Sequence, residues 1–255
     1  MRPYFSTFCL LFCVTTSYSA LSQTTAATIA SPTPFQQEAQ VAVTGGKSFS
    51  VVNLSATAEW TAGSLHESGT AQLQANLDGS TNVQLALGPA SRTEVQTAVA
   101  SSRTCTWTDA AGTSHPIGGA NCFIAVPWFA PSLSTQPISR LPALLGATDN
   151  GEVSTDGSTV HQLNYLLNLQ GTDVASTNLR ISLSTVKVYY DPQTFLPASL
   201  EYSVHPDGND LQSIPVKVTF GNYQSVSGVM LPYHIERFVN QTLQLKLDVT
   251  TASIE

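Results

Sequence analysis

The chain has 255 residues, a formal net charge of -7 and only 11% charged residues. Polar coverage must therefore come mostly from Ser, Thr, Asn and Gln, which is typical of exported β proteins. A nucleic-acid-binding protein needs a basic face, and the absence of any Lys/Arg cluster in the sequence argues against that class.

The first residues have the order of a secretory signal peptide: Arg2, the short apolar run 5–14, then small residues up to Ser22. The run has about half of the ~20 residues that span a bilayer, so we expect no transmembrane anchor in the mature chain. We predict a signal peptide over residues 1–22, cut after Ser22 or after Ser19, and hence a periplasmic or secreted protein. A buried core helix is the alternative.

A loose mature N-terminus is predicted next. Residues 23–34 are rich in Thr, Ala and Pro, and we expect this segment to be flexible. One β domain is then predicted over residues 35–255. It opens with a short helix over residues 34–43, because Pro suits a helix start and Gly45-Gly46 follows its end.

Alternating apolar residues predict strands along most of the domain. In the first half they are Leu54–Trp60, Ala71–Leu77, Val83–Leu87 and Val95–Val99, the second and third joined by an Asp78-Gly79-Ser80 turn. In the second half they are Leu163–Leu169, Leu179–Leu183, Val186–Tyr190, Leu200–Val204, Val216–Phe220, Leu231–Ile235 and Leu243–Val249. A phase change near Ser184 suggests a bulge.

Each predicted strand has one apolar face and one polar, solvent-exposed face, which indicates an antiparallel sheet that is covered on one side. The fold class is therefore mainly β (α+β). We expect a strongly curved antiparallel sheet or unclosed β-barrel of about 10–11 strands, since open sheets of that size usually curl.

Two cysteines, Cys105 and Cys122, remain after the predicted cleavage, since Cys9 and Cys13 lie in the signal. Cysteines of an exported chain usually pair, so we predict a disulfide. A metal or redox pair is the alternative, although the spacing is too wide for a CxxC motif.

The middle of the chain, residues 123–146, breaks the β pattern and is rich in Pro, Trp, Phe and Leu, with one or two helical turns expected over Ser139–Leu145. Such a segment is predicted to act as a short helical lid or plug on the concave side of the sheet. It either completes the core or forms a movable lid over an apolar cavity. The candidate lining residues are Trp60, Trp128, Phe129, Leu144 and Leu145, and the alternative for each is ordinary core.

The second half of the chain carries a family resemblance. Residues 189–203 (YYDPQTFLPASLEYS) give a strand, a DP turn, a Leu-Pro hairpin and a Leu-Glu-Tyr strand. Residues 220–238 (FGNYQSVSGVMLPYHIERF) place Gly-x-x-Leu-Pro before the next strand, and the alternating run QTLQLKLDVTTASI follows. With the hairpin at residues 68–88, this order resembles the LolA/LolB-like superfamily of bacterial periplasmic lipoprotein carriers over most of residues 35–255.

The resemblance implies an unclosed β-barrel around a helical lid, with a hydrophobic cavity for acyl chains. It also implies an arginine that fastens the lid to the barrel, for which Arg92, Arg103, Arg140 and Arg180 are candidates. A lipid or acylated lipoprotein is the implied ligand. The cysteine pair and the Pro-rich middle depart from the simplest carriers, which favours a generic relative over a true lipoprotein transporter.

Motifs for catalysis are not evident, so we predict no catalytic residues, no metal site and no cofactor. The five histidines form no HxH or HExxH spacing, and Glu67-Ser68-Gly69 lacks the first glycine of a Gly-x-Ser-x-Gly elbow. Two carboxylates from distant strands meeting in space would still make an enzyme.

Three hypotheses follow from the sequence. The first is a non-catalytic binding protein of the bacterial cell envelope that holds an apolar ligand on the concave side of the sheet. The second is a structural or protein-interaction module of the envelope with a protein partner. The third is an enzyme.

Overall fold

The computed structural model describes residues 32–99, 102–137, 139–142 and 144–255. The predicted signal peptide over residues 1–22, and the predicted flexible segment up to residue 31, lie outside the described residues. The remaining chain forms one compact unit. The elements, in chain order, are α1 (Pro34–Thr44), β1 (Val51–Ala62), β2 (Leu65–Asn76), β3 (Thr81–Ala86), η1 (Gly88–Ala90), β4 (Arg92–Val99), β5 (Ser102–Thr108), β6 (Ser114–Pro116), α2 (Gly119–Cys122), η2 (Pro131–Thr135), β7 (Leu145–Thr155), β8 (Ser158–Leu167), α3 (Val174–Ser184), β9 (Val186–Tyr190), β10 (Pro197–Val204), β11 (Ile214–Val226), β12 (Val229–Val239) and β13 (Thr242–Ile254).

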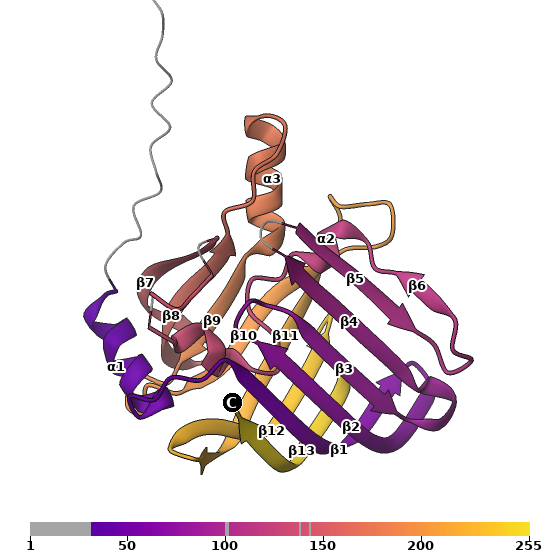
Figure 1. Cartoon of the computed structure of the whole chain (residues 1–255), viewed down its shortest axis with the longest axis horizontal. Coiled ribbons are helices and arrows are strands. Elements are labelled where there is room, and N and C mark those ends of the chain that lie inside the picture. The colour runs from indigo at the N-terminus through magenta and orange to yellow at the C-terminus, as the bar shows by residue number, and fades with distance from the viewer. Residues whose placement is uncertain (1–31, 100–101, 138, 143) are drawn as a thin grey trace, which may run out of the picture. The chain divides into compact units, whose positions relative to one another are not determined.

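The described strands make one 13-stranded antiparallel sheet in the order β6-β5-β4-β3-β2-β1-β13-β12-β11-β10-β9-β8-β7. Most neighbours are consecutive in the chain, and the pairing of β1 with β13 joins the two halves. Among the described residues β6 and β7 have no mutual pairing, so the sheet remains open (Figure 1). The mainly β, unclosed and antiparallel class predicted from the sequence is confirmed.

The strand count exceeds the predicted 10–11 because β5, β6 and β7 were not predicted. Conversely, the predicted strand Leu179–Leu183 is wrong, since it belongs to α3. Asp173 caps that helix by accepting a hydrogen bond from the backbone N–H of Ser176, at 2.7 Å. The phase change near Ser184 is therefore a helix-to-strand junction and not a bulge.

The first helix forms as predicted. Thr33 and Gln36 make a reciprocal capping box, Pro34 opens the helix, and Gly45 ends it in the left-handed conformation. Phe35 stacks on the ring of His161 in β8, at a centroid distance of 3.5 Å. The helix is thereby fixed against the β7–β8 end of the sheet, where Figure 1 also shows it.

The core lies on the inner face of the sheet, where alternate strand residues meet the middle segment. Residues 125–136 of that segment are almost all buried, with Phe129 fully so. Its one regular turn is η2, whereas the helical turns predicted over Ser139–Leu145 are not found among the described residues of that stretch. The sheet curls around this segment because the segment covers its apolar face.

Candidate functional site

Two of the hollows in the described part of the chain lie on opposite faces of the sheet. The first, which we call the outer groove, has a volume of about 1010 Å³. Its lining residues are Asp156, Ser182, Leu183, Thr185, Lys187, Glu201, Tyr202, Ser203, Pro215, Val216, Lys217, Thr219, Phe238 and Gln241. The second, which we call the chamber, has a volume of about 310 Å³. Its lining residues are Thr81, Val83, Arg92, Glu94, Val95, Gln96, Cys105, Trp107, Pro116, Ile117, Gly118, Asn121, Ile124, Trp128, Tyr202, Val204, His205, Asp207 and Arg237.

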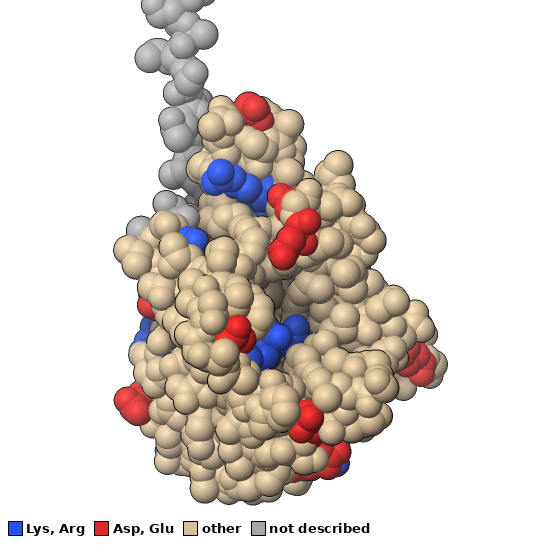
Figure 2. Space-filling model, turned by 90° about the vertical axis from the view of Figure 1, so that its right-hand side faces the viewer, with Lys and Arg blue, Asp and Glu red and all other residues tan. Residues whose placement is uncertain are grey.

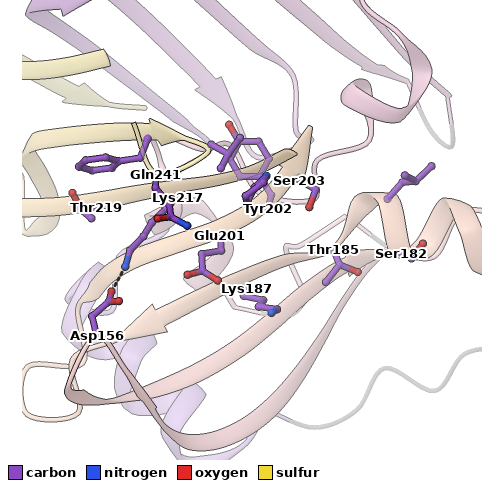
Figure 3. Close-up of a pocket in the computed structure, with 14 residues that line it drawn as sticks. Asp156, Ser182, Thr185, Lys187, Glu201, Tyr202, Ser203, Lys217, Thr219 and Gln241 are labelled. Carbon is purple, nitrogen blue, oxygen red and sulfur yellow. Dashed lines mark hydrogen bonds and ion pairs between the residues drawn. The ribbon is translucent and has the colours of Figure 1, made fainter. Parts of the chain in front are cut away.

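The outer groove runs over the outward-facing side chains of β9, β10 and β11 (Figure 3). Lys217 of β11 pairs with Asp156 at the tip of the β7–β8 hairpin, which therefore reaches across the intervening strands. Glu201 accepts a hydrogen bond of 2.9 Å from the hydroxyl of Tyr189. Charged groups on the groove floor thus have partners or face solvent, while Leu183, Pro215 and Phe238 add apolar surface.

The chamber lies on the inner side of the sheet, between β3–β5, the ends of β10 and β12, and the beginning of the middle segment. Figure 2 looks at the molecule from the side on which β6 lies in Figure 1, and a hollow with Lys or Arg atoms in it opens in that face. Because Arg92 and Glu94 of β4 lie opposite buried core residues of β3, the chamber is on the concave side, and it is the space that best fits the cavity expected from the sequence.

The inner face of β4 turns polar side chains into the chamber. Arg92 and Glu94 are paired in register with Leu85 and Val83 of β3, both of which are buried core residues. The alternation in the sequence predicts that Val95 and Val99 lie on the covered face of this strand. In the structure Val99 is 66% exposed. The assignment of the β4 valines to the covered face is therefore wrong, because the chamber accepts polar groups where a packed core would not.

Three tryptophans and two arginines meet at the chamber through cation–π contacts. The Arg92 guanidinium lies 4.9 Å from the ring centre of Trp107 and 5.9 Å from that of Trp60. The guanidinium of Arg237 lies 5.3 Å from the ring centre of Trp128. Arg237 points inward because its register partners, Val218 of β11 and Leu245 of β13, are core residues. These contacts hold positive charge against apolar walls.

The two arginines differ in their charge partners. Arg92 makes an ion pair of 2.8 Å with Glu94. Arg237 has no carboxylate within 4.0 Å among the residues that the structure describes. The Nε atoms of both arginines are buried without a hydrogen-bond acceptor in the described chain. Unsatisfied buried donors are uncommon in native proteins, and an ordered water or another acceptor commonly completes them.

Two further polar side chains border the chamber. Burial raises the pKa of the Tyr202 phenol and the charge of Arg237 opposes this, so the phenol stays protonated and neutral at physiological pH. His205 Nδ1 lies 3.0 Å from the carbonyl oxygen of Gln212, to which it must donate. In the neutral imidazole Nε2 is then an acceptor, and it is buried without a partner in the described chain.

The predicted lining residues are placed as follows. Trp128 borders the chamber. Trp60 does not line it but contacts Arg92, which does. Phe129 is fully buried in the core, while Leu144 and Leu145 pack partly buried against the core away from the chamber. Trp107, Tyr202, His205, Arg92 and Arg237 also line the chamber, although the sequence did not predict them as lining residues. The position of Arg237 could have been predicted from the sequence. It follows Leu231, Tyr233 and Ile235 at every second position, so its side chain is expected on the same face of the strand.

No protein-family model matches the chain, and no curated protein matches it. Solved structures do match. A domain from Vibrio parahaemolyticus named for outer membrane lipoprotein sorting is 11% identical with a TM-score of 0.50, over 87% of this chain and 91% of that chain. A DUF1329 family protein from Desulfovibrio piger is 10% identical with a TM-score of 0.51, over 86% of this chain and 92% of that chain. A LolA superfamily protein from Nitrosomonas europaea is 12% identical with a TM-score of 0.49, over 87% of this chain and 92% of that chain.

The chain has a LolA-like fold. At identities this low the likeness concerns the fold alone. It confirms the resemblance drawn from the strand and turn pattern.

Within the LolA-like fold of this chain, Arg140 is the candidate arginine that fastens the middle segment. Its Nη2 donates to the Ser50 hydroxyl at 2.8 Å, and its Nη1 donates to the Phe49 carbonyl oxygen at 3.2 Å. Nη1 also donates to Gln136 Oε1, at 3.2 Å. Arg140 therefore joins the end of the segment to the residues that precede β1. The other candidates bind elsewhere: Arg92 to Glu94, Arg103 to the Gly79 carbonyl and Arg180 to the Gln170 carbonyl.

Replacing Arg140 by Gln is expected to lower the free energy of unfolding by about 2 kcal/mol, because hydrogen bonds to a charged donor are lost and buried acceptors remain unpaired. Urea denaturation followed by circular dichroism measures this. Arg180→Gln is the matched control, since Arg180 is exposed on α3, and it should change stability by less than about 0.5 kcal/mol. Equal effects of the two variants would argue against the fastening role.

A disulfide fixes the other end of the segment. Cys105 of β5 and Cys122 of α2 are bonded with their Cα atoms 5.7 Å apart, as predicted. The Asn121 side chain exchanges two hydrogen bonds with the backbone of His205, of 2.8 and 2.7 Å. The chamber wall formed by residues 116–124 is thus anchored to both β5 and the end of β10.

The described residues show neither a metal centre nor a membrane-crossing helix. No three His, Cys, Asp or Glu side chains gather closely enough there to hold a metal ion. None of the helices in that part of the chain has the length and apolar character needed to cross a membrane.

Proposed function

We propose that this chain is an exported, non-catalytic binding protein of the bacterial cell envelope that holds a small lipid-like ligand in the chamber. One observation carries the proposal: an aromatic-walled space lies on the inner side of a LolA-like sheet. A structural neighbour named for lipoprotein sorting supports the choice of a lipid-like ligand.

The size of the chamber limits the ligand. Its volume of about 310 Å³ is at the lower end of the range of about 300–1,000 Å³ for ligand pockets. The rest of the concave side is filled by the buried middle segment. The chamber therefore suits one short acyl chain or a molecule of similar size. A lipoprotein anchor with several acyl chains would require the middle segment to move out.

Export is part of the proposal and rests on the sequence. The mass of the purified mature chain is expected to correspond to an N-terminus at Gln23, or at Ala20 after the alternative cut. A chain that keeps residues 1–22 in its final location would contradict this part.

Filling the chamber provides the direct test of ligand binding. Val204 ends β10 at the chamber wall, and Val204→Trp is expected to lower the affinity for dodecanol at least tenfold, because the indole takes the space of the ligand. Quenching of tryptophan fluorescence measures binding, since two tryptophans line the wall. Val99→Trp is the matched control, because Val99 is exposed on the outer side of β4.

The result would contradict the proposal if wild type bound neither dodecanol nor a charged amphiphile of the same chain length, or if both variants bound dodecanol equally well. Either variant must first show the wild-type circular dichroism spectrum. Lipids that co-purify with wild type and are absent from Val204→Trp would give independent support.

The second candidate function, a protein-interaction module, is favoured by the open edge of the sheet. Within the described residues β7 pairs only with β8, so the 11 residues of its other edge are free to add a strand. Amide hydrogen exchange with and without envelope extract separates the candidates. Protection confined to β7 would favour a protein partner, whereas protection of the chamber strands β4, β5 and β12 would favour the ligand.

A further inference from the structure

The charge of Arg237 is unusual for its surroundings. Its Nε is buried and unpartnered in the described chain, and its guanidinium lies over Trp128. No described carboxylate lies within 4.0 Å of it. The residue as a whole is partly exposed, yet a charge partly withdrawn from water without a counter-charge is solvated less well than one at the open surface. An anion that enters the chamber would remove this cost.

The other charges of the chamber leave the Arg237 end positive. Arg92 and Glu94 are paired with each other at 2.8 Å. Asp207 borders the chamber but is exposed to solvent, where its charge is screened. The chain as a whole carries a net charge of -7, so a general attraction for anions is not the explanation. Any preference for an anion must come from local contacts in the chamber.

We propose that the ligand of the chamber is an amphiphile with one acidic head group, a carboxylate or a phosphate, which pairs with Arg237. This inference rests on the proposed function and specifies its ligand class. The apolar chain lies against the Trp107 and Trp128 rings, and the planar guanidinium binds two oxygens of the head group at once. The unpartnered Nε2 of His205 accepts in the neutral ring, so it is available to the hydroxyl of a singly protonated phosphate, which an ionised carboxylate lacks.

A series of four amphiphiles with the same twelve-carbon chain tests the head group: dodecanoate, dodecyl phosphate, dodecanol and dodecyltrimethylammonium. Each is titrated into the purified chain below its micelle concentration, with tryptophan fluorescence as the readout. Wild type is expected to bind one or both anions at least tenfold more tightly than dodecanol, and the cation more weakly than dodecanol. The two anionic arms distinguish a carboxylate from a phosphate ligand.

Arg237→Gln is expected to lower the affinity for the preferred anion at least tenfold and to change the affinity for dodecanol less than twofold. Gln keeps polar atoms at the site but removes the charge. Arg180→Gln removes a charge on exposed α3 and should leave all four affinities unchanged. The comparison of head groups on wild type remains decisive even if Arg237→Gln fails to fold.

Two outcomes are separable. If wild type binds dodecanol as tightly as both anions, the head-group inference is overturned while the proposed apolar-ligand function stands. If wild type binds none of the four, the proposed function fails as well. Wild-type selectivity for an anion that persists in Arg237→Gln would overturn the role of Arg237.

Discussion

Replacing Phe129 by Ala is expected to lower the free energy of unfolding by about 3–5 kcal/mol. The Phe129 side chain is 0% exposed, and its ring meets Trp128 edge to face at a centroid distance of 5.2 Å. Removing the ring would leave a cavity in the middle of the concave side, where the surrounding strands cannot collapse freely. Urea denaturation with a two-state fit measures the change.

The size of this effect distinguishes a plug from a lid. A plug that completes the core gives the full loss, whereas a segment that leaves the sheet easily would lose less than about 1 kcal/mol. Val99→Ala is the matched control, since Val99 is 66% exposed, and it should cost less than about 0.5 kcal/mol. The burial of residues 125–136 leads us to expect the plug.

The double variant Cys105→Ala/Cys122→Ala is expected to lose about 3 kcal/mol of stability. The disulfide closes a loop over a sequence separation of 17 residues, and the chain-entropy model gives about that value for such a loop. Reduction of the wild-type protein with dithiothreitol should lower its stability to that of the variant. The variant itself should not respond to the reductant.

Loss of the disulfide should also weaken ligand binding, because residues 116–124 form part of the chamber wall. The His205–Asn121 hydrogen bonds and the backbone bond from Ile117 N–H to the Cys105 carbonyl would then hold this wall to the sheet. We expect a several-fold lower affinity for the preferred amphiphile in the double variant. Unchanged stability of wild type after reduction would contradict the structural role of the bond.

Local chemistry explains what could be predicted. Alternation of apolar residues places strands on a half-covered sheet, as for β1 and β13, because side chains of a strand point to its two faces in turn. Pro34 and the glycines after Thr44 mark the ends of α1 through their backbone preferences. The disulfide followed from counting the cysteines left after export.

Two predictions were wrong because the same short sequence pattern is compatible with two different structures. Leu179, Ile181 and Leu183 alternate as in a strand, yet the Asp173 cap starts a helix there. In β4 the valines form the apolar pattern, yet they face outward and Arg92 and Glu94 face the chamber. Which face of a strand is covered depends on what packs against it, and one strand does not contain that information.

The sequence by itself determined the mainly antiparallel sheet, the first helix and the cysteine pair, since each depends on residues close together or on a count. It also carried the resemblance to the LolA-like fold. Only the tertiary structure decided that the middle segment fills most of the concave side and leaves one small chamber. Likewise, the meeting of Arg237 with Trp128 joins residues more than a hundred positions apart, and such a contact depends on the register of the whole curved sheet.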